Sequence, residues 1–477
     1  MKYWLWLLLL LPALLLASPS FASSDTDELR KMLEELRQEV QALKKENAEL
    51  RSQVEQLKQG QVQVAAPAPA KKHSFFSKGA YGSTPSGVDF YGFFKIDAVW
   101  QDSTAVGDNY VLFVLPDRVG GGDNKFTLNF RHSRIGFDFS KPYKDFRVFA
   151  KIEMDFYTQA DVTNPMTYSW NDVHSPLRAR RVFAGVEWGT WQFMAGLDWL
   201  TISQLYPHLS NFPSGSYMGN PGFRMIQARL TKIFNLNDCS RVKVQIAAEQ
   251  PFAMPRDPGL FVYDSDPSND AGFPGVEGRI AYESKLFGKP FLVALWGHYS
   301  QEEYDLASGG EEDAESYSIG MELKIPLPIE RKAFIAGEIW YGRNFDGYYV
   351  ASVAQGTRFR FADGTYSLSP KAKKGKITAV DVDEIDAWGG WIELQLFWTP
   401  KLVTHFGWGV DNPDNSDLKG IANARLQQQM YYANFLYRLT KEFGFGMEYM
   451  YIETDYHKAA GGDGELNRIS GSLYYFF

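Results

Sequence analysis

The sequence predicts an all-β fold, a 16-stranded antiparallel transmembrane β-barrel that follows an N-terminal periplasmic α-helical coiled coil. Three observations predict the barrel. About sixteen segments of ten or more residues alternate apolar and polar side chains, which suits strands that cross a bilayer at a tilt. The connections between these segments alternate between long and short, as in outer-membrane barrels. The chain also ends on an aromatic residue, Phe477, within a segment of the same alternation.

The composition excludes several other classes of protein. The mean hydropathy of −0.30, with one long apolar run among 477 residues, excludes a bundle of membrane-spanning helices. The net charge of −8 argues against a protein that binds nucleic acid through a basic surface. The single cysteine, Cys239, excludes an intramolecular disulfide framework and a zinc site built on paired cysteines. A soluble enzyme, a soluble binding protein and a β-barrel with a polar lumen remain.

Residues 1–22 have the organisation of a secretory signal peptide. Lys2 supplies the positive charge, and residues 3–16 form an apolar core that is too short to span a bilayer comfortably. Ser20 and Ala22 are the small residues that precede a cleavage site. The alternative is an uncleaved membrane anchor. No cysteine follows the site, which excludes a lipoprotein, and we expect the mature protein to be exported.

Residues 23–59 carry a heptad pattern that predicts a coiled coil for oligomerisation. Position e is always basic, and leucine occupies every d position over about four heptads. The d residues are Leu29, Leu36, Leu43, Leu50 and Leu57. Asn47 at an a position fixes register at a cost in stability, while Glu39 and Glu46 at g positions can pair with a parallel neighbour. A lone solvated helix is the alternative, and valine at a with leucine at d nominally favours a dimer.

Residues 60–87 are rich in Gln, Ala, Pro, Gly and Ser without an apolar period, which predicts a flexible linker. From residue 88 to residue 477 the hydrophobic period is 2, and this part of the chain is the expected barrel domain. Between residues 146 and 156, for example, every even position is apolar and most odd positions are charged.

The barrel domain divides into strands at regular intervals. Strands are expected to start near residues 88, 125, 145, 177, 191, 223, 241, 276, 290, 315, 332, 385, 401, 426, 443 and 467. Long connections are expected near residues 103–123, 159–176, 204–222, 251–275, 302–314, 344–384, 411–425 and 455–466. The connections between these are short. An even number of strands places both ends of the domain in the periplasm, where the coiled coil must lie.

In the last strand, residues of one parity are expected to face the lipid. Ile469, Leu473 and Phe477 share it, so the terminal aromatic residue would close the barrel. Alternation alone also fits a soluble β-sandwich. The strand lengths and the rhythm of the connections favour the barrel, and an exported soluble β-protein remains the alternative.

Four short motifs resemble strands of Gram-negative porins. Residues 131–137 (RHSRIGF) resemble the R-x-S-R-x-G-F strand of that group, and residues 151–157, 433–437 and 446–449 resemble later strands. Taken with the signal peptide, heptads and linker, the chain resembles the DcaP-like trimeric porins, and the phosphate-selective porins of the OprP and OprO kind have a similar plan. The resemblance implies a homotrimer in the outer membrane, among lipid and lipopolysaccharide, that admits small and mostly anionic solutes. Phe477 resembles the signal recognised by the barrel assembly machinery.

The lumen is expected to select solutes rather than to catalyse a reaction. A barrel of about sixteen strands leaves an aqueous channel that side chains cannot fill, and rings of Arg and Lys in such a channel favour anions. Basic residues of inward parity therefore predict the solute-binding lining. They are Lys95, Arg131, Arg147, Lys151, Arg178, Arg180, Arg229, Lys243 and Arg279, together with Arg134 and Arg224 where the alternation breaks.

The C-terminal half contributes acidic residues of inward parity. Glu322, Glu393 and Glu448 have it and Glu338 is a further candidate, so an acidic wall would face a basic wall across the pore. The alternative is that these charges pair with one another and only line a wet wall.

Residues 204–222 form the third long connection. In porins generally this loop folds inward, and an ordinary outward loop is the alternative.

No motif indicates an enzyme, a cofactor or a transition-metal site. The seven histidines include no HExxH and no i,i+4 pair, and no GxSxG or Walker motif occurs. Two sets of aspartates have the oxygen ligands that calcium prefers, although acidic loops are more often simply solvated. These sets are Asp411, Asp414 and Asp417, and Asp381, Asp383 and Asp386.

We expect a porin for small anionic solutes; a phosphate-specific porin, a barrel enzyme and an envelope-anchoring adhesin are the alternatives.

Overall fold

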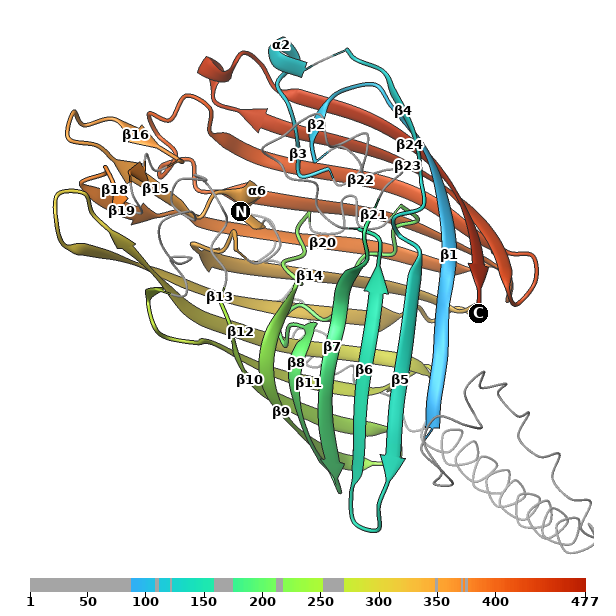
Figure 1. Ribbon diagram of the computed structural model, residues 1–477. Helices are drawn as coiled ribbons and strands as arrows, with labels where there is room; N and C mark the ends of the chain where they lie inside the picture. Colours follow the sequence, from blue (N-terminus) through green and yellow to red (C-terminus); the bar gives the residue numbers. More distant parts are fainter. Residues whose placement is uncertain are drawn as a thin grey trace, which may run out of the picture. The chain divides into compact units, whose positions relative to one another are not determined.

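The computed structural model describes residues 87–107, 111–120, 122–157, 175–211, 218–251, 270–347, 351–369, 372–373 and 376–477. The expected signal peptide, the coiled coil and the linker up to residue 86 lie outside these ranges. The described residues from 87 onward form a closed barrel with loops at its ends (Figure 1). Within these ranges, no helix has both the length and the apolar character needed to cross a bilayer.

Sixteen antiparallel strands form the barrel, as predicted. Their bounds are β1 (Gly87–Gln101), β4 (Lys125–Asn129) with β5 (Arg134–Pro142), β6 (Arg147–Asp155), β7 (Arg178–Trp188), β8 (Trp191–Trp199), β9 (Arg224–Asn237), β10 (Ser240–Glu249), β11 (Gly275–Leu286), β12 (Lys289–Asp305), β13 (Glu311–Pro326), β14 (Ala333–Arg343), β20 (Asp386–Phe397), β21 (Leu402–Pro413), β22 (Arg425–Arg438), β23 (Phe443–Tyr456) and β24 (Gly464–Phe476). Both β4 and β5 pair with β1, so they are two parts of one barrel strand. Pairing of β1 with β24, for example Phe93 with Phe476, closes the barrel. Every strand begins within four residues of its predicted start.

The connections are short at one end of the barrel and mostly long at the other (Figure 1). The predicted long connection at residues 302–314 is wrong. Strands β12 and β13 stay paired as far as Asp305 and Glu311, and the chain reverses at Gly309 and Gly310, whose φ angles are 91° and 100°. Glycine adopts positive φ without a steric cost, which permits this tight turn. The hairpin extends beyond its neighbours, because β11 pairs with β12 only as far as Tyr299 and β14 pairs with β13 only from Tyr317.

Among the described residues, three of the long connections contain secondary structure that the sequence pattern did not indicate. Residues 344–385 hold a helical turn, a three-stranded sheet and a small hairpin. These elements are α6 (Ala351–Ala354), β15 (Thr357–Arg360), β16 (Tyr366–Ser367), β17 (Ala372–Lys373), β18 (Lys376–Ile377) and β19 (Asp381–Glu384). Residues 102–124 hold β2 (Ala105–Val106), β3 (Phe113–Val114) and α2 (Asp117–Gly120), and η3 (Lys458–Ala460) precedes β24.

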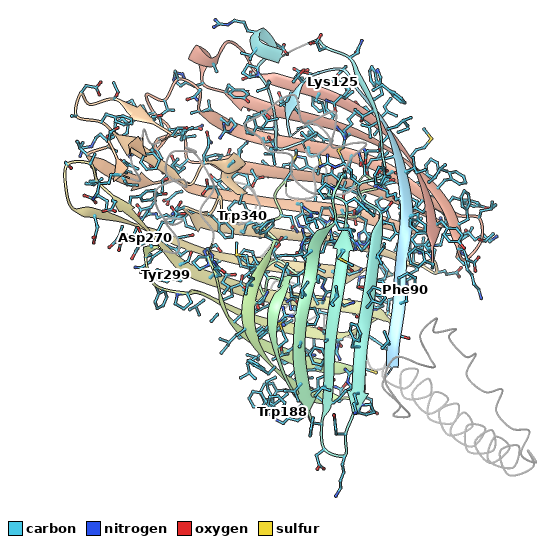
Figure 2. All side chains as sticks on the ribbon, in the orientation of Figure 1. Phe90, Lys125, Trp188, Asp270, Tyr299 and Trp340 are labelled. Carbon is cyan, nitrogen blue, oxygen red and sulfur yellow. The ribbon has the colours of Figure 1, made fainter. Side chains whose placement is uncertain are left out.

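The outer surface of the barrel is apolar and the inner surface is polar. In β13, Ile319 points outward with 63% of its surface exposed, whereas its neighbour Ser318 points inward and is buried. Figure 2 shows the outward side chains of Phe90 and Trp188, and Trp340 is buried inside. Other exposed apolar side chains include Phe94, Phe126, Leu128, Ile226, Ile246, Ile280, Leu295, Ile339 and Ile392. The predicted assignment of apolar parity to the outside is therefore confirmed.

The porin-like motif at residues 131–137 is not one continuous strand. Residues 130–133 interrupt it between β4 and β5. Within the break, the Ser133 hydroxyl accepts a hydrogen bond from the Lys95 amide (2.9 Å) and donates one to the Lys95 carbonyl (3.1 Å), so a side chain replaces the ladder contact. Arg131 and His132 are consequently buried rather than placed on an alternating strand.

Candidate functional site

The connection between β8 and β9 is residues 200–223, and we call it the lumen loop. Its described residues, 200–211 and 218–223, lie inside the barrel. It begins with Leu200 and Ile202, which are fully buried against Trp296, Trp340 and Phe345 of the opposite wall and its loop. Of the two possibilities for this connection, the structure therefore has the inward one. The apolar start fixes the direction in which the rest of the loop crosses the lumen.

Carboxylates of the wall hold the lumen loop by its backbone. The amide of Leu205 donates to Glu322 (2.5 Å), that of His208 to Glu393 (2.7 Å) and that of Ser210 to Glu448 (2.6 Å). The same pattern includes Thr201 with Glu277 (2.7 Å), the Ser203 hydroxyl with Glu338 (2.8 Å), Asn211 with Glu448 (3.0 Å) and Gly219 with Asp411 (3.0 Å). We call these six carboxylates the anchor carboxylates.

The predicted acidic wall is thus not open to the pore. All four glutamates expected to form it are anchor carboxylates, and each is at most 5% exposed because the loop covers it. A buried carboxylate needs hydrogen-bond donors in place of water, and amide and hydroxyl groups of the loop supply them here. The glutamates therefore position a loop instead of facing the basic wall across water.

Strands β5 to β9 carry a cluster of arginines, which we call the basic wall. Five guanidinium groups lie within ion-pair distance of three buried carboxylates, which leaves a formal charge of +2. The pairs are Arg178 with Asp155 (2.8 Å), Arg180 with Glu153 (3.0 Å) and Asp155 (2.8 Å), Arg181 with Asp198 (2.6 Å), Arg229 with Asp198 (2.9 Å) and Arg134 with Glu153 (3.7 Å). The side chains of Arg134, Arg178 and Arg181 remain 21–26% exposed, so they reach the water of the lumen.

One arginine of the basic wall was missed by the sequence pattern. Strand β7 contains a bulge opposite the step from Glu153 to Met154, where Arg181 pairs with Glu153 and Ala179 pairs with Met154. The extra residue is Arg180, so Arg180 and Arg181 both face inward. Simple alternation put Arg178 and Arg180 inside and Arg181 outside. A bulge shifts parity by one residue, and no residue type in this stretch marks it.

The remaining predicted lining residues divide by their partners. Arg131 and Arg224 lie over the rings of Tyr157 (4.5 Å) and Trp199 (4.6 Å), beside the basic wall. Lys151 pairs with Asp138 (2.5 Å), and Arg147 pairs with Glu187 near a short turn. Lys243 lies 3.6 Å from Glu283.

Lys95 and Arg279 are predicted lining residues that do not face open water. Lys95 is fully buried between Asp97 (2.9 Å) and the carbonyl of Ser210 (2.5 Å), where it holds the lumen loop. Arg279 of β11 is 3% exposed and pairs with Glu322 of β13 (2.7 Å), across the intervening strand β12. Parity predicted their inward direction, but the loop that covers them removes them from the lining. Most of the predicted set therefore forms ion pairs with carboxylates, as the alternative expected, and the role of these residues in selection stays a prediction.

A basic cavity lies between the lumen loop and the short turns. Its volume is about 540 Å³, and Leu205 of the lumen loop contributes to its lining. Its charged lining residues are Arg241, Lys285, Lys324, Lys332, Asp238 and Glu283, a formal charge of +2. A neighbouring cavity of about 320 Å³ includes Arg229 and Lys243. The positive charge of the basic wall thus continues towards this end of the barrel.

The two aspartate sets that could have held calcium do not converge. Asp381, Asp383 and Asp386 each pair with an arginine, Arg360, Arg358 and Arg343 respectively. Asp411 accepts the Gly219 amide as an anchor carboxylate. Among the residues that the structure describes, neither aspartate set brings three ligand atoms together.

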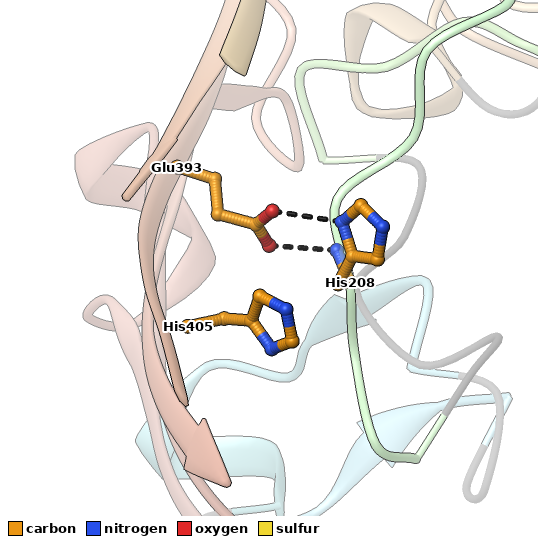
Figure 3. A group of neighbouring side chains, drawn as sticks. All are labelled: His208, Glu393 and His405. Atoms are coloured by element: carbon orange, nitrogen blue, oxygen red, sulfur yellow. Dashed lines mark hydrogen bonds and ion pairs between the residues drawn. The ribbon is translucent and has the colours of Figure 1, made fainter. Parts of the chain in front are cut away.

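Two histidines that are far apart in the sequence meet in the lumen. His208 of the lumen loop lies against Glu393 of β20 and His405 of β21 (Figure 3). The imidazole of His208 is 2.8 Å from Glu393, and its ring stacks on that of His405 with centroids 5.0 Å apart. The sequence contained no signal for this meeting, because the residues lie on different elements and share no motif spacing.

No protein-family model and no curated protein matches this sequence. Solved structures do resemble the chain. The outer membrane channel DcaP of Acinetobacter baumannii has a TM-score of 0.61 at 18% identity, over 82% of this chain and 97% of that chain. An anion-selective porin from Comamonas acidovorans has a TM-score of 0.49 at 10% identity, over 82% and 100%. OmpF of Salmonella typhi in complex with daunomycin has 0.48 at 14%, over 82% and 97%. The expected resemblance is thus confirmed at the level of architecture, and the chain has the fold of the outer-membrane channel DcaP.

Proposed function

We propose that this protein is a DcaP-like outer-membrane porin whose water-filled lumen passes small solutes and prefers anions, carboxylates among them. The closed barrel, the apolar outer surface and the polar interior support a channel in a lipid bilayer, because an apolar band around a closed barrel is stable in lipid. The proposal includes the signal peptide, the periplasmic coiled coil and a homotrimer.

The two charged walls differ in their exposure to the lumen, and this difference supports a preference for anions. The anchor carboxylates are covered by the lumen loop and accept hydrogen bonds from its amide and hydroxyl groups. The basic wall keeps a formal excess of two positive charges and stays partly exposed. A solute that passes between them meets guanidiniums within a few ångströms, well inside the Debye length of about 8 Å at physiological salt. The planar guanidinium fork also binds carboxylate or phosphate in a bidentate manner.

The end of the chain supports the proposed assembly in the membrane. Phe477 exchanges two backbone hydrogen bonds with Gly92 (both 3.1 Å), and its ring lies 5.0 Å from Phe90. The last residue therefore completes the ladder between the first and last strands. We propose that this residue is the one recognised by the barrel assembly machinery and that the outer surface contacts lipid and lipopolysaccharide.

The reversal potential in a salt gradient tests the selectivity. Purified protein in planar bilayers should prefer chloride to potassium. The variant Arg178→Ala with Arg180→Ala removes two positive charges and should lower that preference. The matched control, Arg178→Ala with Asp155→Asn, removes one charge of each sign and should leave the preference nearly unchanged. Lys at both sites should keep the preference but weaken binding of a dicarboxylate, since the bidentate fork is lost.

Folding must be measured first, because Asp155 is buried and loses both arginines in the double Ala variant. Breaking a buried pair costs about 3–5 kcal/mol. Heat-modifiable migration in mild detergent reports the folded fraction. Cation preference in the parent would refute the anion proposal and leave the porin proposal intact. An equal loss in the control variant would assign the effect to altered structure instead of charge.

A further inference from the structure

The lumen loop and the barrel wall meet at a cluster of three metal-ligating side chains. His208 comes from the loop, Glu393 from β20 and His405 from β21, and one ligand atom of each lies within 4.8 Å of the others. Figure 3 shows the two imidazoles and the carboxylate turned towards one another. Two imidazoles and a carboxylate form a ligand set that holds Zn²⁺ in proteins, with water in the remaining position.

The proton positions on His405 leave a lone pair for a ligand bond. The Asn434 amide nitrogen donates to the carbonyl of His208 (2.7 Å) and to Glu448 (2.9 Å), which fixes the orientation of the Asn434 side chain. Its oxygen therefore faces Nδ1 of His405 at 2.8 Å and can only accept. Nδ1 of His405 thus carries the proton and Nε2 has the lone pair. A metal-bound histidine is commonly held by such a hydrogen bond from its other nitrogen.

The carboxylate is also oriented by its neighbours. Glu393 accepts hydrogen bonds from the Tyr432 hydroxyl (2.6 Å) and the Gln395 amide (2.8 Å), and its side chain is fully buried. The side chain of His208 is 49% exposed, so an ion can reach the cluster from the lumen and water can complete its coordination. Two ligands are therefore fixed on the wall, and the third lies on a loop and is accessible.

We propose that His208, Glu393 and His405 form a binding site for a divalent transition-metal ion, with Zn²⁺ as the type. Tetrahedral coordination needs ligand atoms about 3.3 Å apart, which follows from Zn–N and Zn–O bonds of about 2.0–2.1 Å. The accessible His208 ring supplies this contraction by moving towards the wall, with its proton on the ring nitrogen that does not bind the metal. The bound ion replaces the hydrogen bond between His208 and Glu393 and fastens the lumen loop to β20 and β21. Ca²⁺ and Mg²⁺ prefer sets of oxygen ligands and bind this site poorly.

Calorimetric titration of the full-length protein in detergent with ZnCl₂ tests this site without reference to conductance. The parent should bind a single Zn²⁺ per chain, and CaCl₂ or MgCl₂ at the same concentration should not compete. His208→Ala and His405→Ala should each weaken binding by more than about tenfold. The matched control is His457→Ala, which changes a histidine beyond the end of β23 and should bind like the parent.

A second variant separates metal ligation from an effect on folding. His208→Cys keeps a ligand for Zn²⁺ at the accessible position, so it should recover most of the affinity that His208→Ala loses. Its Co²⁺ complex should show thiolate-to-metal absorption that the parent lacks. The proposal is overturned if the parent does not bind Zn²⁺, if both Ala variants bind as the parent does, or if the Cys variant shows neither recovery nor that absorption. None of these outcomes bears on the porin proposal, because the measurement does not involve transport.

Discussion

At the residue scale, the hydrogen-bond donors around a lumen glutamate decide its role. Glu448 accepts the amides of Ser210 and Asn211 as well as the Asn434 side chain, and it is buried under the loop that it holds. A carboxylate with three donors is well satisfied even out of water. The same chemical group that would attract cations in an open pore here acts as an anchor.

Glu448→Gln should loosen the lumen loop. The Gln side chain has one accepting oxygen and an amide group that also donates, so at least one of the backbone amides of Ser210 and Asn211 loses its acceptor. We expect a loss of about 1–3 kcal/mol in stability and a larger, noisier single-channel conductance. Denaturant titration and bilayer recording measure these effects. Glu453→Gln on the same strand faces away from the lumen and serves as control; equal behaviour of the two variants would contradict the anchoring role.

At the element scale, the return of the lumen loop depends on a close approach to the wall. Gly219 has a φ of 76°, and a Cβ at this position would lie 2.0 Å from the carbonyl oxygen of Gly390 on β20. A Cβ on Gly409 of β21 would likewise lie 2.3 Å from the carbonyl oxygen of Met218. The loop backbone therefore rests directly on two strands, and any side chain here would push it into the lumen.

Gly219→Ala should be more harmful than an Ala at an open glycine with the same backbone. Gly288 is the matched control, since its φ is 69° and nothing lies within 4 Å of its Cβ position. Both variants bear the cost of a left-handed residue, about 1–2 kcal/mol. Only Gly219→Ala should lose more stability than that, and only this variant should also change the conductance. Equal losses of stability in denaturant titrations would show that the contact with Gly390 is not important.

The strands themselves predict where lipid must lie. Ile280 is exposed near the middle of β11, and Leu286 is exposed at the end of the same strand beside a short turn. Ile280→Arg should cost about 2–4 kcal/mol in folding into lipid vesicles, while Leu286→Arg should cost about 0–1 kcal/mol. Urea titration in vesicles gives both values. A small cost at Ile280 would favour the soluble β-protein that alternation alone allowed.

At the scale of the whole molecule, the barrel and the N-terminal segment have separate tasks in the proposed trimer. In this proposal the barrel supplies the channel, and its closure pairs Phe93–Gln101 of β1 with Arg468–Phe476 of β24. The predicted coiled coil at residues 23–59 lies outside the described ranges and stays a prediction. If it associates, it raises the effective concentration of the partner barrels.

An excised peptide of residues 25–58 should associate in parallel. Asn47→Val should raise its thermal midpoint and broaden its choice of oligomeric state, because a buried polar residue sets specificity at a cost in stability. Analytical ultracentrifugation and circular dichroism measure both. Deleting the segment from the full chain should weaken the oligomer and leave the conductance of each pore unchanged. A peptide that stays monomeric at high micromolar concentration would refute the coiled coil.

The sequence by itself determined the barrel, because the alternation of side chains is a local property of each strand. A period of 2 over ten or more residues identifies a strand and its outward face without knowledge of its neighbours. The starts of the strands, their antiparallel pairing along the chain and the inward direction of Lys95, Arg178 and Glu322 follow from that pattern. The alternation pattern fails where the strand geometry changes without a signal in the sequence, as at the bulge that turns Arg181 inward.

Only the tertiary structure decided which charges meet. Every residue except proline has a backbone amide, so nothing in residues 200–223 marks the amides that will reach Glu322, Glu393 and Glu448. Closure of the barrel brings these strands around the loop, and the loop then covers one charged wall and leaves the other exposed. The contact of His208 with His405 has the same origin. Local patterns specify strands, whereas contacts across a lumen depend on the path that a connection takes through it.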